Sequence, residues 1–156
     1  MSQNNLGWKQ GVKDGLPIAL GYLSVSFTFG MAAAAAGLSA GEAVMISATN
    51  LTSAGQFAGL TLIQTQASLL EMALTTLVIN LRYALMSLSL AQKLDPAMSR
   101  LQKAVLAFGN TDEIFAVAVS HPIVRFHYML GLILTPMAGW NDHTASIYKL
   151  PENLHP

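Results

Sequence analysis

The feature that most constrains this chain is the length of its stretches without charge. Residues 15–41 and 43–70 are windows of 27 and 28 residues that hold no Asp, Glu, Lys or Arg. A third window, residues 72–92, is interrupted only by Arg82. Because a helix needs about 20 apolar residues to cross the hydrocarbon core of a bilayer, each window is long enough to span it. The pattern predicts an all-α, polytopic helical membrane protein.

Composition excludes several other classes of protein. Only 10% of the residues are charged, whereas soluble domains carry about 25%, so an ordinary cytosolic enzyme is excluded. The formal net charge is zero, which gives no reason to expect a nucleic-acid partner. There is no cysteine, the four histidines lack metal-ligand spacing, and no phosphate-binding glycine loop is present. We therefore expect no enzyme activity, no metal and no cofactor.

The same windows predict three regions. Residues 1–14 are expected to form a cytoplasmic or interfacial N-terminus, and residues 15–140 a transmembrane helical domain. Residues 141–156 are polar and contain two prolines, so we expect a disordered tail. The transmembrane region should hold about four spanning helices, at residues 16–36, 69–91, 104–120 and 123–140, with a loop at 92–103.

The segment at residues 43–66 is predicted to be re-entrant or broken, with a plain span as the alternative. Two basic clusters bracket the first three apolar segments, namely Lys9 with Lys13, and Lys93 with Arg100 and Lys103. Both clusters should face the cytoplasm. A full crossing by residues 43–66 would put them on opposite sides. The centre of this segment, residues 49–56, is also too polar to face lipid. The N-terminus is thus expected to be cytoplasmic.

Two four-residue patterns resemble the start of a helix inside the membrane. Ser53-Ala-Gly-Gln56 has the form of a capping box, and Asn110-Thr-Asp-Glu113 has a related form. Half-helices of this kind direct backbone amides at bound anions and often mark a transport site. Chance occurrence in a short polar break is the alternative. Helix breaks or close packing are expected at Pro17, Gly30, Gly55 and Gly109.

Arg82, Asp112 and Glu113 are the ionisable residues predicted at or near membrane depth. Charge there is costly, which makes these residues functional candidates. We expect Arg82 to pair with one of the two acids, because an unpaired buried charge would be less stable. Adjacent helical positions point about 100° apart, so both acids should not serve one site. A structural ion pair and a functional one both remain open.

Five short motifs occur in a distinctive order. They are Asp14-Gly-Leu-Pro-Ile-Ala-Leu-Gly-Tyr22, Phe29-Gly30, Ala54-Gly-Gln-Phe57, Asn80-Leu-Arg-Tyr83 and Thr111-Asp-Glu113. In these motifs the sequence resembles the AzlC family of bacterial inner-membrane permeases, over about residues 11–140. The resemblance implies export of branched-chain amino acids with a small membrane partner of the AzlD type. Its motif positions are Asp14, Pro17, Gly55, Gln56, Asn80, Arg82, Asp112 and Glu113. Family members continue past Trp140, so the resemblance also implies a C-terminally shortened copy.

These observations lead to a conditional transport mechanism. The candidate site residues are Asp112, Glu113, Arg82, Asn80, Gln56, Ser53 and Asn110. The substrate carboxylate would lie near the start of a half-helix, and its ammonium would bind Asp112, assisted by the Gln56 or Asn80 carbonyl. Its aliphatic part would contact an aromatic such as Phe29, Phe57 or Phe115. A carboxylate at membrane depth suits proton coupling. The alternative is a non-transporting scaffold or an inactive shortened copy, and the oligomeric state stays open.

Overall fold

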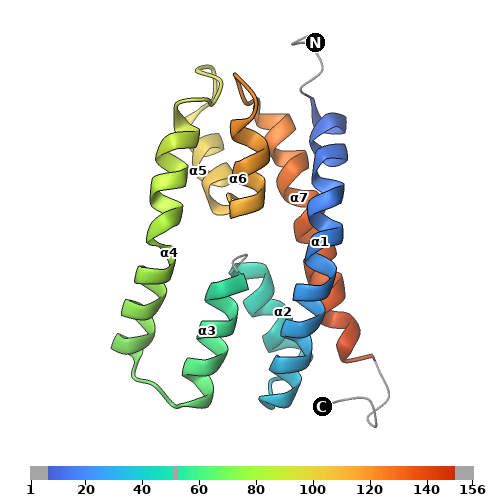
Figure 1. The fold of residues 1–156 in the computed structure, drawn as a ribbon, viewed down its shortest axis with the longest axis vertical. Helices are drawn as coiled ribbons and strands as arrows, with labels where there is room; N and C mark the ends of the chain where they lie inside the picture. The colour runs from blue at the N-terminus through green and yellow to red at the C-terminus, as the bar shows by residue number, and fades with distance from the viewer. Residues whose placement is uncertain (1–6, 51–52, 150–156) are drawn as a thin grey trace. The chain divides into compact units, whose positions relative to one another are not determined.

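The computed structural model describes residues 7–50 and 53–149. In these ranges the regular structure is α-helical (Figure 1), except for one isolated β-bridge between Leu94 and Val124. Three helices are long: α1 (Trp8–Ala35), α4 (Leu69–Ala91) and α7 (Phe126–Ile147). Four are short: α2 (Ala40–Thr49), α3 (Ser53–Gln64), α5 (Arg100–Phe108) and α6 (Asp112–Val119). The prediction of an all-α chain is confirmed.

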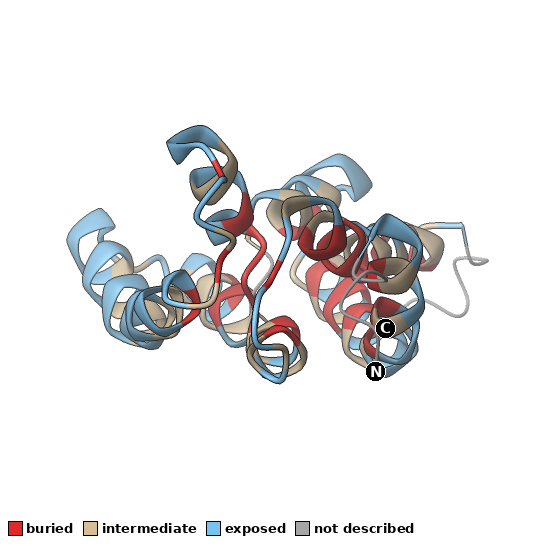
Figure 2. Cartoon of the chain, turned by 90° about the horizontal axis from the view of Figure 1, so that it is seen from above, coloured by how far each residue is buried: buried red, intermediate tan, exposed pale blue. Residues whose placement is uncertain are grey.

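Within the described ranges, α1 and α4 are the helices long and apolar enough to cross a membrane. Helix α4 has little contact with the rest of the chain, since only its Leu90 is buried (Figure 2). Leu69 is 85% exposed and Val78 is 72% exposed. A core helix of a soluble protein would bury such residues, so this surface suits contact with lipid. The apolar stretches at residues 43–66 and 104–120 are each divided between two short helices. Helix α7 is long but ends in polar residues.

The segment at residues 43–66 is broken, as predicted, into α2 and α3. Helix α2 begins with a capping box that sequence reasoning missed: Ser39 Oγ accepts a hydrogen bond from the Glu42 amide, and the Glu42 carboxylate accepts one from the Ser39 amide at 2.8 Å. The helix ends at Thr49 and is capped by Asn50, whose backbone is extended. The predicted cap at Ser53 is wrong, because Ser53 already belongs to α3 and the Gln56 side chain donates to the Asn50 carbonyl instead.

The stretch at residues 104–120 is also broken, into α5 and α6. Helix α5 begins at Arg100, inside the region expected to be a loop, because Ser99 and Gln102 form a second capping box. The helix ends at Gly109. The cap of α6 is Thr111, whose hydroxyl accepts from the Ile114 amide at 3.5 Å, so the predicted cap at Asn110 is wrong by one residue.

The chain divides into two compact units. Unit 1 consists of Met1–Leu20 and Arg82–Pro136, and unit 2 consists of Gly21–Leu81 and Met137–Pro156. Unit 1 therefore contains the broken pair α5 and α6, and unit 2 contains the broken pair α2 and α3. Each of the three long helices contributes one part to each unit.

In unit 1, α1 and α7 approach so closely that only glycine fits at the contact. A Cβ atom at Gly11 would lie 2.0 Å from the Tyr128 carbonyl oxygen, and one at Gly131 would lie 2.7 Å from the Trp8 carbonyl oxygen. Tyr128 and the neighbouring Met129 are fully buried. Pro17 lies inside α1, within the helix predicted at residues 16–36, and does not end it, so of the two roles expected for this residue a helix break is excluded.

In unit 2, the core forms around Phe29, Ala33, Ala43 and Leu60, with Phe57 packed against it. The rings of Phe29 and Phe57 meet edge to face with centroids 5.7 Å apart. This packing makes Phe29 a core residue, with no exposed surface for a substrate.

The tail does not begin at residue 141, because α7 continues to Ile147. Trp140, Thr144 and Ile147 are buried and share one face of α7. Thr144 lies 3.2 Å from Ser47 between their hydroxyl oxygens, and Ile147 packs against Gly30. The expectation of a disordered tail is therefore wrong for residues 141–147. Residues 150–156 lie outside the described ranges.

Candidate functional site

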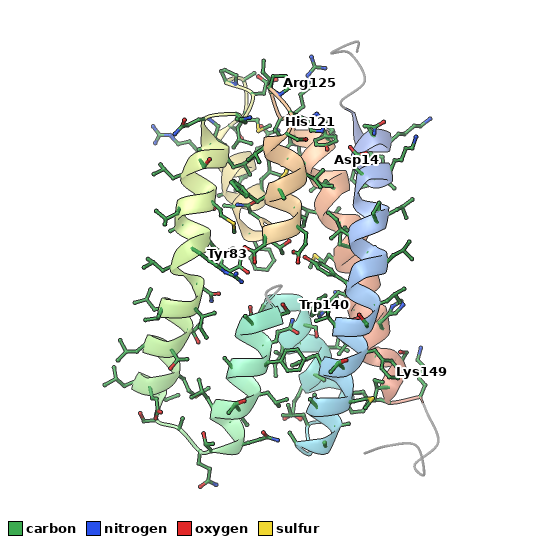
Figure 3. The ribbon with its side chains drawn as sticks, in the orientation of Figure 1. Asp14, Tyr83, His121, Arg125, Trp140 and Lys149 are labelled. Atoms are coloured by element: carbon green, nitrogen blue, oxygen red, sulfur yellow. The ribbon has the colours of Figure 1, made fainter. Side chains whose placement is uncertain are left out.

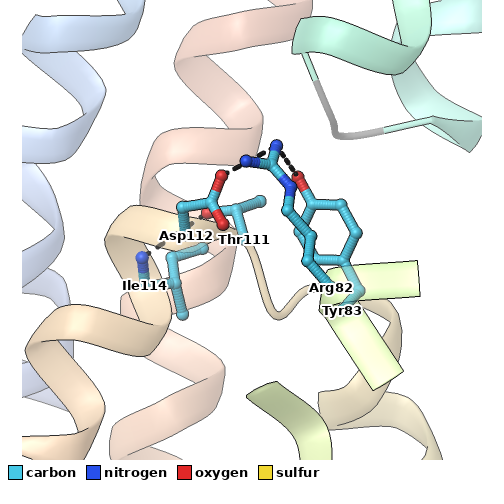
Figure 4. Close-up of polar contacts among 5 residues, drawn as sticks. All are labelled: Arg82, Tyr83, Thr111, Asp112 and Ile114. Carbon is cyan, nitrogen blue, oxygen red and sulfur yellow. Dashed lines mark hydrogen bonds and ion pairs between the residues drawn. The ribbon is translucent and has the colours of Figure 1, made fainter. Parts of the chain in front are cut away.

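A charged pair lies in unit 1, where α4 approaches the start of α6. Arg82 Nη2 is 2.9 Å from Asp112 Oδ2 (Figure 4). The pairing predicted for Arg82 is thus formed, with Asp112 as the partner. The two side chains are 48% and 40% exposed, respectively. Neither side chain is enclosed by the rest of the chain, so both are accessible to a ligand.

Tyr83 contacts the same nitrogen of the Arg82 guanidinium as Asp112 does. Arg82 Nη2 donates to the Tyr83 hydroxyl oxygen at 3.1 Å, and the guanidinium carbon lies 5.0 Å from the centre of the Tyr83 ring. Stacking of this kind orients a guanidinium and limits its motion. Tyr83 belongs to the Asn80–Tyr83 motif but is not among the predicted site residues. Its position next to Arg82 was the only available signal.

The break between α5 and α6 holds further polar residues close in sequence to Asp112. Asn110 is only 3% exposed. Its side-chain nitrogen Nδ2 donates to Ser87 Oγ at 3.4 Å, whereas its side-chain oxygen Oδ1 accepts no hydrogen bond from the described residues. A buried carbonyl oxygen without a donor costs about 1–3 kcal/mol. Gly109 is needed here for space, because a Cβ atom would lie 2.3 Å from Ile133 Cγ2. Glu113 is exposed and follows Asp112 in the first turn of α6.

The other predicted site residues belong to unit 2. Gln56 is 1% exposed, and its Oε1 accepts no hydrogen bond from the described residues. The same holds for Asn80 Oδ1, which is also buried. Ser53 is the first residue of α3, and Gly55 is buried in that helix. Unit 1 therefore holds Arg82, Asn110 and Asp112, of which Arg82 and Asp112 are in contact, while unit 2 holds Gln56, Ser53 and Asn80.

The basic residues are divided unequally between the units. Seven of the eight basic residues lie in unit 1, namely Lys9, Lys13, Arg82, Lys93, Arg100, Lys103 and Arg125; Lys149 lies in unit 2. In unit 1 the start of α1, the end of α4 and the start of α5 lie at the same end (Figure 1). Both basic clusters used in the topology argument are therefore at one end of this unit. A cytoplasmic location for that end remains a prediction.

A second polar cluster in unit 1 was missed by sequence reasoning, apart from Asp14. The Tyr128 hydroxyl donates to Asp14 Oδ2 at 2.9 Å, and its oxygen lies 2.9 Å from His121 Nε2. Gln10 Nε2 donates to the other oxygen of Asp14 at 2.7 Å. No sequence spacing could reveal the cluster, because Asp14 and Tyr128 are 114 residues apart. Across residues 7–50 and 53–149, no three His, Cys, Asp or Glu side chains are grouped so as to hold a metal ion.

Comparisons with known proteins agree with one another. The AzlC protein family profile matches residues 17–146. The chain is 32% identical over 137 residues to the inner membrane protein YgaZ of Escherichia coli (strain K12), covering 84% of this chain and 56% of YgaZ. It is 36% identical over 138 residues to an uncharacterized membrane protein of Archaeoglobus fulgidus, covering 88% of this chain and 60% of the relative.

A third relative, an uncharacterized membrane protein of Helicobacter pylori (strain J99), is 36% identical over 109 residues, 67% of this chain and 47% of its own length. No solved structure matches the chain. The alignments span about half to three-fifths of the length of these relatives. Taken together, the family match over most of the chain and the membrane relatives show that this chain is a membrane protein of the AzlC family.

Proposed function

We propose that the chain is part of a bacterial inner-membrane permease that exports branched-chain amino acids, acting as a secondary transporter with a small membrane partner of the AzlD type. The observation that carries the proposal is the half-exposed Arg82–Asp112 pair at the start of α6. Membership of the AzlC family supports it, since that family is associated with amino-acid export.

A zwitterionic amino acid needs a cation for its carboxylate and acceptors for its ammonium group. Arg82 suits the carboxylate, because a guanidinium binds a carboxylate through two parallel hydrogen bonds. Asp112 suits the ammonium group, since its carboxylate oxygens accept hydrogen bonds. The start of α6 is a less favourable place for the carboxylate than first expected, because Asp112 and Glu113 already supply negative charge there.

Apolar side chains one helical turn away from the pair would contact the aliphatic part of the substrate. Leu85 follows Arg82 by three residues on α4 and is 68% exposed. Phe115 follows Asp112 by three residues on α6 and is half-buried. Residues three apart share a helical face, so each lies next to one member of the pair. Such a surface favours leucine, isoleucine and valine over polar amino acids.

Efflux from cells tests this proposal. Cells that lack their own exporters are loaded with labelled leucine and valine, and efflux is compared with and without the chain and a small AzlD-type partner. We expect Arg82→Gln and Asp112→Asn each to lower the efflux rate at least tenfold. Asp95→Asn, which removes an acid from the loop after α4, is the matched control and should leave efflux unchanged.

A double variant separates transport from the scaffold alternative. In Arg82→Asp combined with Asp112→Arg the ion pair can form again, but each charge is displaced relative to the substrate. A scaffold would regain its assembly and its function with this exchange. The transport proposal predicts that assembly returns while efflux stays low. Equal efflux from cells without the chain, or wild-type efflux in both single variants, would contradict the proposal.

A further inference from the structure

The cluster of Asp14, Tyr128 and His121 joins three separate elements of unit 1. Asp14 lies on α1, Tyr128 on α7 and His121 in the connection between α6 and α7. Tyr128 is fully buried between the two ionisable side chains. Figure 3 shows Asp14 and His121 at the end of unit 1 where α7 begins. The proposed transport site does not use any of the three residues.

The hydrogen-bond directions in this cluster can be assigned. The single proton of the Tyr128 hydroxyl is donated to Asp14 Oδ2. The Tyr128 oxygen must then accept from His121, so His121 carries its proton on Nε2 when the ring is neutral. A proton taken up from water would bind Nδ1 and leave both hydrogen bonds in place. The resulting imidazolium would be balanced by the Asp14 carboxylate through the Tyr128 hydroxyl.

The other charged groups on these elements do not compete for the cluster. Lys9 and Lys13 on α1, and Arg125 and His127 at the start of α7, are exposed. The Lys93 ammonium donates to the Val119 carbonyl oxygen. The Asp95 carboxylate accepts from the Ala97 amide at 2.9 Å. The remaining contact is neutral, because Gln10 donates to Asp14 Oδ1 and fixes the orientation of the carboxylate.

We propose that Asp14, Tyr128 and His121 form a proton-binding site, separate from the Arg82–Asp112 pair. Histidine is the side chain that changes charge between pH 5 and 8, and here its charge is linked to a carboxylate on another helix. Protonation strengthens the attraction between α1 and the α6–α7 connection, whereas loss of the proton weakens it. The effect of this site on export rests on the proposed function, but proton binding itself does not.

Histidine-selective NMR on the purified chain tests proton binding directly. The four histidine signals are assigned with His→Gln variants, and the pH midpoint of His121 is measured in wild type and variants. We expect Asp14→Asn to lower this midpoint, because the balancing charge is lost. Tyr128→Phe should lower it as well. Asp95→Asn removes an equal charge from the same unit and is expected to leave the midpoint within about 0.2 pH units of wild type, since its carboxylate does not contact the cluster.

Wild-type protein provides a test that does not depend on a folded variant. At high pH the ring nitrogens of His121 should show a proton on Nε2. A proton on Nδ1, or an equal shift in Asp14→Asn and Asp95→Asn, would overturn the proposal. Efflux from proteoliposomes at different pH values then measures its role in transport, where Asp14→Asn should displace the pH profile. Absence of efflux from the wild type would count against the proposed function while the NMR result still decides the proton site.

Discussion

Each of the two units contains a pair of short helices separated by a break, but the side chains that follow the break differ between the units. In each, a serine with a capping box starts a short helix of 10 or 9 residues, and an asparagine follows that serine by 11 positions: Ser39 and Asn50 in unit 2, Ser99 and Asn110 in unit 1. After the break, unit 1 carries Asp112, paired with Arg82, whereas unit 2 carries the neutral Gln56. The same break therefore does not give the two units the same chemistry, because the residues that follow it differ.

The largest expected effect concerns packing between α1 and α7 in unit 1. Gly11→Ala would place a Cβ atom 2.0 Å from a backbone oxygen, which cannot move without shifting α7. We expect a loss of about 3 kcal/mol in the free energy of unfolding, measured in mixed micelles. Gly30→Ala is the counterpart in unit 2, where the nearest atom belongs to the Ile147 side chain, at 2.7 Å, and we expect a smaller loss of about 1–2 kcal/mol. Gly21→Ala meets no atom within 4 Å and is the control.

A smaller effect should distinguish the two roles of Arg82. Arg82→Lys keeps the charge but cannot form the bidentate hydrogen bonds of a guanidinium with a carboxylate, and it loses the stacking on Tyr83. We expect efflux to fall by about tenfold, which corresponds to about 1.4 kcal/mol. The free energy of unfolding should change by less than about 0.5 kcal/mol, because the pair is half-exposed. A large loss of stability with full efflux per folded molecule would show a structural ion pair instead.

The caps test whether the two broken pairs are equivalent. Ser39→Ala and Ser99→Ala each remove the acceptor for an amide at the start of a short helix. Each should cost about 1 kcal/mol, and the two losses should agree within about 0.5 kcal/mol. Ser68→Ala, which removes the same kind of contact before the long helix α4, is a useful comparison. A strong effect at one cap alone would contradict the equivalence.

The smallest effect concerns Glu42, which lies between the two charge-free windows. Hydrogen bonds from the Ser39 hydroxyl and then from its backbone amide lower the pKa of Glu42 below the ordinary value of 4.5. Because the folded state has the lower pKa, this stabilisation is present above pH 4.5 and is lost as the pH falls through the lowered value. Unfolding measured between pH 6 and 3 should show this loss in wild type. Glu42→Gln should remove that part of the pH dependence.

Sequence reasoning predicted the helical fold, the break at residues 43–66 and the Arg82 pairing, because each depends on local composition or on the cost of unpaired charge. The predicted N-caps of the two helices that follow the breaks, Ser53 for α3 and Asn110 for α6, are wrong. Asn110, Thr111 and Asp112 are all good capping residues, so composition alone does not fix which one starts α6. The helical end of α7 was missed because its buried face, with Trp140, Thr144 and Ile147, gains its stability from contacts with distant helices. The Asp14–Tyr128–His121 cluster depends on such contacts entirely.

Direct binding of leucine to the purified chain with its small partner is the most decisive measurement, because the central claim is that the charged break of unit 1 binds the substrate. Equilibrium binding should be saturable in wild type and in Asp95→Asn. It should be at least tenfold weaker in both Arg82→Gln and Asp112→Asn. Binding of equal strength in all four proteins, each shown to be folded, would contradict the account.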